Sequence, residues 1–274
     1  MVARSLCRSR LIFFESASRI YLPESDPRSD PQLRISEAFE HLTRRTLDVL
    51  IPPRCIGCNT REIWLCGQCR SNLSGLTEPL CTVCSRPSTP SKVCGECYRH
   101  PPPYEVLRAP WSHTGLAREL VHALKFQGQR HLARLIASEM YLLVDPSIDV
   151  IVPVPLHRDR FNDRGYNQSE LLARELGAQL ACRVDNKMLI RTRATVPQSG
   201  LDRADRLVNV RGAFSFNRRR DSDRHILLVD DVTTTGATIA ACARLLRQHG
   251  VDRISAIVAT RATDALDGQS SQPG

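Results

Sequence analysis

The chain has 274 residues, of which 42 % are hydrophobic, so its length suits one α/β domain with a full core and a small additional module. No segment approaches the length of a membrane-spanning helix, which argues against membrane insertion and favours a cytoplasmic protein. The formal net charge is +9, a balance compatible with nucleic acid and with polyphosphorylated compounds as partners.

The first 45 residues differ in character from the rest of the chain. Four arginines and four serines fall within residues 1–20, and residues 23–31 mix proline with Asp and Arg. The apolar run at residues 11–14 is too short for a secretion signal. We therefore expect residues 1–45 to be a disordered or weakly structured extension. A start codon placed upstream of the native one and an Arg/Ser-rich mitochondrial-type presequence are the alternatives.

Residues 46–104 contain eight of the eleven cysteines, arranged as four Cys-x-x-Cys pairs. Each pair places two thiolates on one turn, and two turns complete a tetrahedral zinc site, so four turns can hold two structural Zn²⁺ ions. Sequential and interleaved pairing both fit the spacing. A disulfide framework is disfavoured because nothing indicates export. The pairs are Cys55/Cys58, Cys66/Cys69, Cys81/Cys84 and Cys94/Cys97.

Residues 150–156 form a second informative segment, with the sequence VIVPVPL. The apolar run predicts a buried strand. Pro153 and Pro155 cannot donate to a β-ladder, so we expect the strand to give way there to a loop. The basic segment that follows contains His157, Arg158, Arg160 and Arg164. It suits a phosphate-binding loop, with a solvated basic turn as the alternative.

The first part of residues 191–217 shows little periodicity and includes Pro197 and Gly200, which predicts a long loop. Long loops in compact domains are often lids, and a lid has a purpose wherever water would intercept a reactive centre. A disordered basic loop is the alternative.

Residues 225–238, HILLVDDVTTTGAT, are the most informative part of the chain. The apolar residues 226–229 predict a short parallel strand that ends before Asp230 and Asp231. A Thr/Gly loop comes next, and from Ile239 to Gln248 the apolar spacing predicts a helix. In open α/β sheets, ligands bind at this junction of strand and helix.

This loop suits a sugar phosphate. Unpaired amides and the positive end of the helix dipole cradle phosphate, Gly236 permits close approach, and the threonine hydroxyls add donors. The two acids would repel phosphate, so we expect them to face ribose hydroxyls or a divalent cation. A helix cap needs one such residue, not two acids and four threonines, which makes a purely structural turn the weaker interpretation.

Residues 226–238 resemble the phosphoribosyl-pyrophosphate (PRPP) signature of type I phosphoribosyltransferases. The resemblance implies an α/β fold with a parallel sheet flanked by helices over residues 105–262. The Gly/Ser/Gln-rich composition of the end of the chain predicts a disordered tail at 263–274. The resemblance also implies Mg²⁺ bound with PRPP. The implied roles are ribose contact for Asp230 and Asp231; 5-phosphate binding for Thr233, Thr234, Thr235, Gly236, Ala237 and Thr238; and pyrophosphate binding for Leu156, His157 and Arg158. The lid expected within residues 191–217 offers four further residues that can reach the pyrophosphate: Arg193, Gln198, Arg203 and Arg206.

The order of the motifs resembles the ComF family of competence-associated phosphoribosyltransferase-like proteins, which includes the GntX group. The motifs are the Cys-x-x-Cys block, LKF at 124–126, VPVPLH at 152–157, RGYNQ at 164–168, PQSGL at 197–201, RGAF at 211–214 and the PRPP loop. The family implies a role in DNA uptake, an unidentified acceptor and a competence-machinery protein as partner. Two hypotheses remain open: a glycosyltransferase that transfers a pentosyl group, and a non-catalytic single-stranded DNA-binding or regulatory protein that retains the PRPP-binding fold.

Overall fold

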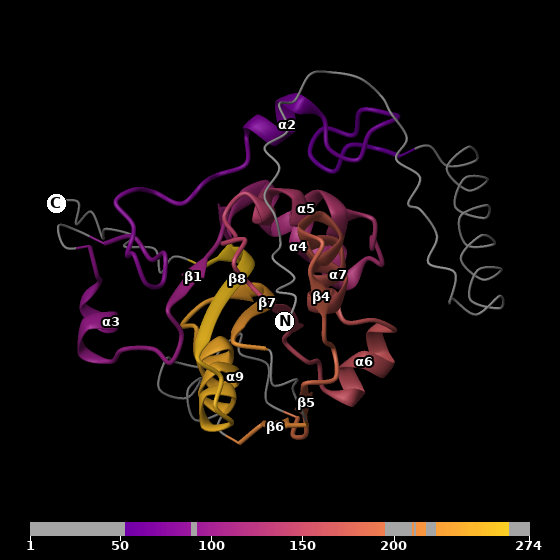
Figure 1. Cartoon of the computed structure of the whole chain (residues 1–274). Coiled ribbons are helices and arrows are strands. Elements are labelled where there is room, and N and C mark those ends of the chain that lie inside the picture. The colour runs from indigo at the N-terminus through magenta and orange to yellow at the C-terminus, as the bar shows by residue number, and fades with distance from the viewer. Residues whose placement is uncertain (1–52, 89–91, 195–209, 211, 218–222, 263–274) are drawn as a thin grey trace, which may run out of the picture. The chain divides into compact units, whose positions relative to one another are not determined.

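The structure is a computed structural model that describes residues 53–88, 92–194, 210, 212–217 and 223–262 (Figure 1). The chain divides into two compact units, Met1–Ser71 and Asn72–Gly274. The expected extension at residues 1–45 and the expected tail at 263–274 lie outside the described residues. The domain boundaries drawn from the sequence therefore stay predictions.

The described part of the first unit carries the first four cysteines of the Cys-x-x-Cys block. An antiparallel bridge between Arg54 and Arg61 closes the turn that holds Cys55 and Cys58. The amide of Cys55 donates to the carbonyl of Thr60 at 2.7 Å. The short helix α2 (Gly67–Ser71) then carries the last cysteine of this group. So short a helix has little stability of its own, which agrees with folding that depends on a bound metal.

The second unit is built on a six-stranded sheet in which every described pairing is parallel. The order is β1-β8-β7-β3-β4. Strand β2, which follows β1 in the chain, pairs with the last two residues of β8. The two central strands are buried on both faces, as is typical of parallel sheets covered by helices. The strands are β1 Val106–Arg108, β2 Trp111–Ser112, β3 Val150–Pro153, β4 Arg183–Val184, β7 His225–Thr233 and β8 Arg253–Arg261.

Helices cover both faces of this sheet, which confirms the predicted α/β fold. On one face, α9 buries Ile239, Cys242 and Leu246 against side chains of β3, β7 and β8. On the other, α7 contacts β3 and β7, and α5 packs on α7 (Figure 1). The helices are α4 Gly115–Phe126, α5 Leu132–Tyr141, α6 Arg158–Arg164, α7 Gln168–Leu180 and α9 Ala237–Gln248.

The strand β7 is longer than the sequence predicted. It was expected to end before Asp230, yet it continues through both acids to Thr233 and stays paired with β8, with Asp230 opposite Val258. Apolar periodicity stops at the first charged residue, whereas backbone pairing continues wherever a partner strand is present. The following helix begins at Ala237, two residues before the predicted start at Ile239.

Arg191, where the predicted loop was expected to begin, is paired rather than irregular. Strand β5 (Leu189–Arg191) runs antiparallel to β6 (Phe214–Phe216), with Arg191 opposite Phe214. Residues 195–209 and 211 between them lie outside the described part of the chain.

The second group of four cysteines belongs to the same compact unit as the sheet. It includes the short helix α3 (Gly95–Arg99). The amide of Leu107 in β1 donates to the carbonyl of Val83 at 2.7 Å, and the hydroxyl of Ser85 donates to the carbonyl of Leu107 at 2.8 Å. These contacts fix the second cysteine group to the edge of the sheet.

Within the described ranges, no helix has both the length and the apolar character that crossing a bilayer requires.

Candidate functional site

A cavity of about 830 Å³ lies at the carboxyl ends of β3 and β7. Its walls come from α4, from the β3–α6 loop and α6, from the start of α7, and from the β7–α9 junction. This is the position at which ligands bind in open α/β sheets, because the loops there leave space between the helices and the ends of the strands.

Asp230 is buried at one side of this cavity, with 9 % of its surface exposed. Its Oδ1 accepts a hydrogen bond from the hydroxyl of Ser169 at 2.8 Å and another from the amide of Asp231 at 2.9 Å. Burial, followed by the negative charge of Asp231, raises the pKa of Asp230 to about 7. This carboxyl group therefore titrates near neutral pH.

Asp231 is also buried, and it faces a cation. Its Oδ2 lies 2.8 Å from the Nζ of Lys125, which comes from the last turn of α4 and also lines the cavity. A buried carboxylate needs such a counter-charge, because an isolated charge would be costly in this environment. The ion pair therefore ties α4 to the end of β7.

The Thr/Gly loop forms the next part of the wall. Gly236 is the N-cap residue of α9 and adopts a left-handed conformation with φ of 83°. No side chain of this residue occupies the helix N-terminus. The hydroxyl of Thr235 accepts the amide of Ala237 at 3.3 Å. Thr234 and Thr238 line the cavity, whereas Thr233 is buried within β7. The positive end of the α9 dipole thus opens toward the cavity, as phosphate binding requires.

The predicted pyrophosphate loop is only partly at the cavity. Leu156 lines it, but His157 and Arg158 are not among the lining residues. Instead, His157 caps α6 by accepting the amide of Asp159 at 3.4 Å, and Arg158 is exposed as the first residue of that helix. The cationic wall consists of Arg118, Arg160, Arg164 and Arg191.

The sequence placed Arg160 and Arg164 in the basic segment but assigned the phosphate contact to Arg158, and it gave no role to Arg118 or Arg191. Arg160 and Arg164 are four residues apart on one helix, a spacing that places them on the same face. Burial lowers the pKa of Arg164 and of Arg191, and both remain charged because arginine titrates so far above neutrality.

The predicted lid is largely outside the described residues. Arg193 is exposed and does not line the cavity. Gln198, Arg203 and Arg206 lie between residues 195 and 209, outside the described part. The lid and its contacts stay a prediction.

The RGYNQ motif at residues 164–168 connects the elements that surround the cavity. The side chain of Asn167 caps α7 by accepting the amide of Ser169 at 3.0 Å, and its Nδ2 donates to the carbonyl of Val154 at 3.0 Å. The hydroxyl of Tyr166 donates to the carbonyl of Leu124 in α4. The motif therefore links α4, β3 and α7, and it positions Ser169 against Asp230.

The eight clustered cysteines form two groups by sequential pairing, so the interleaved alternative does not occur. In each group the four Sγ atoms lie within 4.8 Å of one another. The Sγ atoms of Cys58 and Cys66 are 3.6 Å apart, and those of Cys84 and Cys94 are 3.8 Å apart. A tetrahedral zinc ion with Zn–S bonds of about 2.3 Å separates its sulfurs by about 3.8 Å. The donor sets therefore fit Zn²⁺.

Backbone amides prepare both groups for metal binding. The amide of Cys66 donates to the Sγ of Cys55, and the amide of Cys94 donates to the Sγ of Cys81, each at 3.3 Å. Burial opposes ionisation of Cys55 and Cys81, yet together the amide donors lower the pKa of each to about 6. Thiolates are the metal-binding form. No two of the ten described cysteines are joined by a disulfide.

Comparison with known proteins agrees with this two-part construction. Residues 46–98 match the family described as double zinc ribbon domain, and residues 164–269 match the phosphoribosyl transferase domain. Competence protein F of Haemophilus influenzae is 32 % identical over 216 residues, which cover 73 % of this chain and 93 % of the relative. The chain belongs to the ComF family.

Other relatives of this ComF protein have similar coverage. The DNA utilization protein YhgH of Escherichia coli (strain K12) is 35 % identical over 195 residues, which cover 68 % of this chain and 85 % of the relative. Competence protein ComFC of Bacillus subtilis is 30 % identical over 225 residues, which cover 78 % of this chain and 87 % of the relative. These matches confirm the resemblance drawn from the motif order.

Proposed function

We propose that this ComF protein binds PRPP together with Mg²⁺ in the cavity at the carboxyl edge of the sheet and transfers the phosphoribosyl group to an acceptor. The observation that supports this most strongly is the convergence of unlike groups on one space. Two buried acids, a helix N-terminus with threonines and four arginines all border the same cavity. A sugar with phosphates at both ends has matching chemistry.

Each wall has a proposed task. The carboxylates of Asp230 and Asp231 accept from the ribose hydroxyls, and the loop from Thr234 to Thr238 donates to the 5-phosphate. Arg160 and Arg164 hold the pyrophosphate, because guanidinium groups match phosphate geometry and neutralise its charge. The protein thereby orients the sugar for attack at C1 and stabilises the departing pyrophosphate.

The residues present fit a magnesium ion. Carboxylate oxygens are the hard ligands that Mg²⁺ takes from proteins, usually one or two alongside phosphate oxygens and water. Asp230 and Asp231 would hold it with the ribose hydroxyls and the pyrophosphate. When bound, the ion supplies neutralisation of the leaving group's charge.

A role in DNA uptake is proposed from the relatives. Two of them are named as competence proteins and another as a DNA utilization protein. We propose that this chain acts in the same process, in the cytoplasm and with a protein of the competence machinery. On this proposal, the acceptor would be a base, nucleotide or amine of nucleoside metabolism.

The decisive experiment measures pyrophosphate release from PRPP and Mg²⁺ with a panel of purine, pyrimidine and amine acceptors. Release with one acceptor and not with the others would establish both the activity and the acceptor class. Release with none, together with calorimetric binding of PRPP, would leave a PRPP-binding protein without transferase activity. No binding of PRPP would overturn the proposal.

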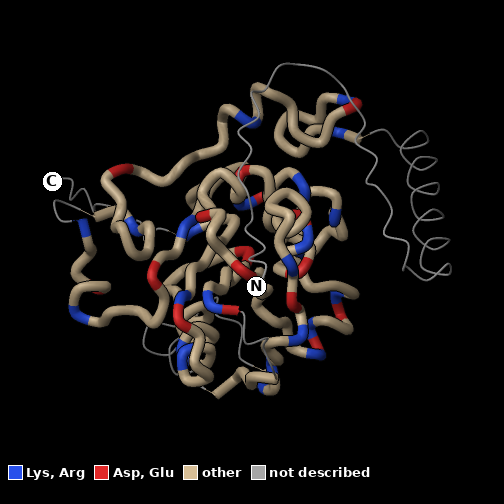
Figure 2. The backbone as a smooth tube through the Cα atoms, viewed as in Figure 1, with Lys and Arg blue, Asp and Glu red and all other residues tan. Residues whose placement is uncertain are grey.

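The second candidate is a non-catalytic protein that binds single-stranded DNA, and the names of the relatives favour it. The net charge of +9 is compatible with this function. Along the described backbone, however, basic and acidic positions are interspersed (Figure 2). If this candidate is right, fluorescence anisotropy with a labelled oligonucleotide will show affinity that falls steeply with salt. Binding that is absent or independent of salt would remove it.

A further inference from the structure

Lys125 and Ser169 hold the two acids at the end of β7 in different ways. The Nζ of Lys125 lies 2.8 Å from the Oδ2 of Asp231. Beyond this ion pair, that oxygen has no hydrogen-bond partner among the described residues. Asp230 instead accepts hydrogen bonds from the hydroxyl of Ser169 and from the amide of Asp231. One acid is thus held by neutral donors and the other by a positive charge.

The side chain of Lys125 is less enclosed than the acid that it contacts. It is 24 % exposed, whereas the side chain of Asp231 is 4 % exposed, and both line the cavity. The backbone beside Lys125 is anchored, since the hydroxyl of Tyr166 donates to the carbonyl of Leu124. The flexible four-carbon stem is therefore the part that can move. The ammonium can leave Asp231 while the last turn of α4 stays in place.

A lysine at this point suits a contact that is made and broken. The chain has only three lysines among its 38 lysines and arginines, and the other residues of these two types that line the cavity are arginines. A guanidinium holds a carboxylate through two parallel hydrogen bonds, whereas an ammonium is a single point charge on a flexible stem. The cation on Asp231 is therefore of the type that is more easily released.

A phosphorylated ligand would bring the ammonium another anionic partner. The Cζ of Arg164, which is proposed to hold the pyrophosphate, lies 5.0 Å from the ring centroid of Phe126, the residue next to Lys125. A phosphate bound by Arg164 is therefore brought to the end of α4, in the cavity that Lys125 also lines. Phosphate oxygens accept charge-assisted hydrogen bonds from an ammonium as carboxylates do.

We propose that Lys125 is a displaceable counter-ion that keeps divalent cations off Asp231 until PRPP is present. This inference rests on the function proposed for the cavity. In the free protein, the ammonium neutralises the carboxylate that a divalent cation needs, and two cations on one carboxylate oxygen repel each other. When PRPP binds, Lys125 transfers its ionic contact from Asp231 to the pyrophosphate. Asp231 then becomes available, so a divalent cation and PRPP bind together rather than independently.

Binding of Mn²⁺ in place of Mg²⁺ tests this in the zinc-loaded full-length protein without PRPP, because the electron paramagnetic resonance signal of the free ion disappears on binding. Lys125→Met removes the charge and should raise the affinity for Mn²⁺ about tenfold. Lys187→Met is the matched control, since Lys187 is exposed and does not line the cavity, and it should change the affinity less than twofold. Adding Asp231→Asn to Lys125→Met should remove the gain, which assigns the bound ion to the acids.

Lys125→Arg distinguishes displacement from a purely structural ion pair. Arginine keeps the charge, so Mn²⁺ should stay excluded, but its two-pronged contact to Asp231 is harder to release. Calorimetric affinity for PRPP in the presence of Mg²⁺ should therefore fall about tenfold. A structural ion pair predicts instead that Lys125→Arg binds PRPP as the wild type does and that Lys125→Met changes thermal stability alone.

A folded Lys125→Met variant that binds Mn²⁺ no more tightly than the wild type would overturn the proposal. Tight binding of Mn²⁺ to the wild type without PRPP, abolished by Asp231→Asn, would overturn it as well, and that comparison needs no variant of Lys125. The failure of the proposed function is recognised differently. If PRPP does not bind the wild-type protein, the cavity is no PRPP site, whereas the Mn²⁺ comparison still decides whether Lys125 keeps cations off the acids.

Discussion

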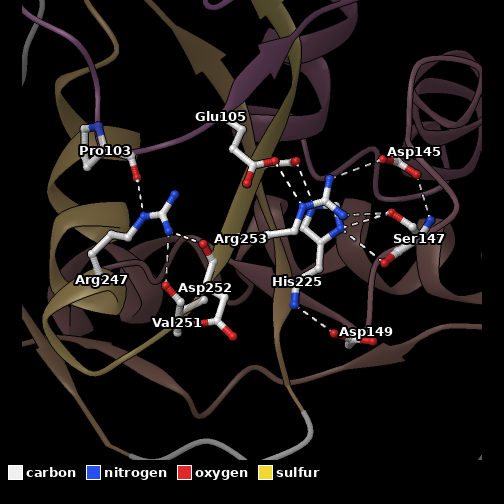
Figure 3. A network of polar contacts seen from close by, with 11 residues as sticks. Pro103, Glu105, Asp145, Ser147, Asp149, His225, Arg247, Val251, Asp252 and Arg253 are labelled. Atoms are coloured by element: carbon white, nitrogen blue, oxygen red, sulfur yellow. Dashed lines mark hydrogen bonds and ion pairs between the residues drawn. The ribbon is translucent and has the colours of Figure 1, made fainter.

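The two ends of the central sheet use polar residues in opposite ways. At the amino ends of β7 and β8, charged side chains pair with one another and with backbone groups (Figure 3). At the carboxyl ends, Asp230 and Asp231 border a cavity of about 830 Å³ together with four arginines. Polar groups that complete one another's hydrogen bonds stabilise a fold, whereas polar groups that converge on a space are available to a ligand.

The amino end shows how complete such pairing is. The Oδ2 of Asp149 accepts the amides of Arg224 and His225 at 2.9 and 2.7 Å. The ring of His225 lies 2.8 Å from the hydroxyl of Ser255 through Nε2 and 3.1 Å from the carbonyl of Ser147 through Nδ1. Both ring nitrogens therefore have polar partners within the fold.

The largest expected effect comes from the carboxyl end. Asp231→Asn removes the charge that pairs with Lys125 and that is proposed to face the ribose, so binding of PRPP with Mg²⁺ should weaken about a hundredfold and turnover should cease. Calorimetry measures the binding, and thermal unfolding serves as the control for folding. Unchanged Mg²⁺-dependent affinity in a folded variant would contradict the proposed site.

Substitution of two arginines of α6 should have a smaller effect on PRPP binding, and the effect should differ between them. Arg164 lines the cavity and Arg158 does not, although the sequence pointed to Arg158. Arg164→Ala should therefore weaken PRPP binding about tenfold, since one charge-assisted contact to phosphate is lost, while Arg158→Ala changes it less than twofold. Titration calorimetry with both variants makes the comparison. The reverse order would return the pyrophosphate site to the residue that the sequence indicated.

A substitution at the amino end should behave in the opposite way. Asp149→Ala removes an acceptor shared by two amides and should lower the free energy of unfolding by about 1–2 kcal/mol without changing PRPP affinity. Glu105→Ala, which breaks an exposed ion pair with Arg253, is the matched control and should cost less than about 0.5 kcal/mol. Urea denaturation measures both. Loss of affinity in the Asp149 variant would show that the two ends are not independent.

Binding should depend on pH through Asp230. Its pKa is raised to about 7, so the carboxylate form, which Mg²⁺ and ribose hydroxyls require, accumulates as the pH rises from 6 to 8. PRPP affinity should increase over that interval by up to about tenfold. Asp230→Asn should abolish this dependence. Lys125→Met should move it to higher pH, because the lysine lowers the pKa of Asp230. Affinity that is flat with pH in the wild type would contradict the assignment.

Stability should depend on pH through His225, and this is the smallest effect. Burial lowers the pKa of His225 in the folded protein below its ordinary value of 6.5. The contribution of His225 to the free energy of unfolding is therefore fully present above pH 6.5. It is lost as the pH falls, because the histidine of the unfolded chain takes up a proton at higher pH than that of the folded protein. His225→Gln should flatten this part of the stability profile. Denaturant midpoints between pH 5 and 8 provide the measurement.

The sequence predicted the parts of the site that are contiguous in the chain. The acids, the threonine loop and the cysteine pairs were found because each motif carries its own spacing. It did not predict Lys125 or Ser169 as partners of the acids, since these contacts join helices α4 and α7 to β7 across long separations. Nor could spacing choose between sequential and interleaved cysteine pairs, because only the fold brings two turns together.

The extension of β7 to Thr233 has a geometric consequence for any ligand. The backbone around both acids is fixed by pairing with β8, while their side chains reach two different helices. Asp230 accepts a hydrogen bond from Ser169 at the start of α7, and Asp231 pairs with Lys125 in the last turn of α4. A molecule that engages both carboxylates must therefore fit between the end of β7 and these two helices, so that sequence changes on α4 or α7 would shift it relative to the strand.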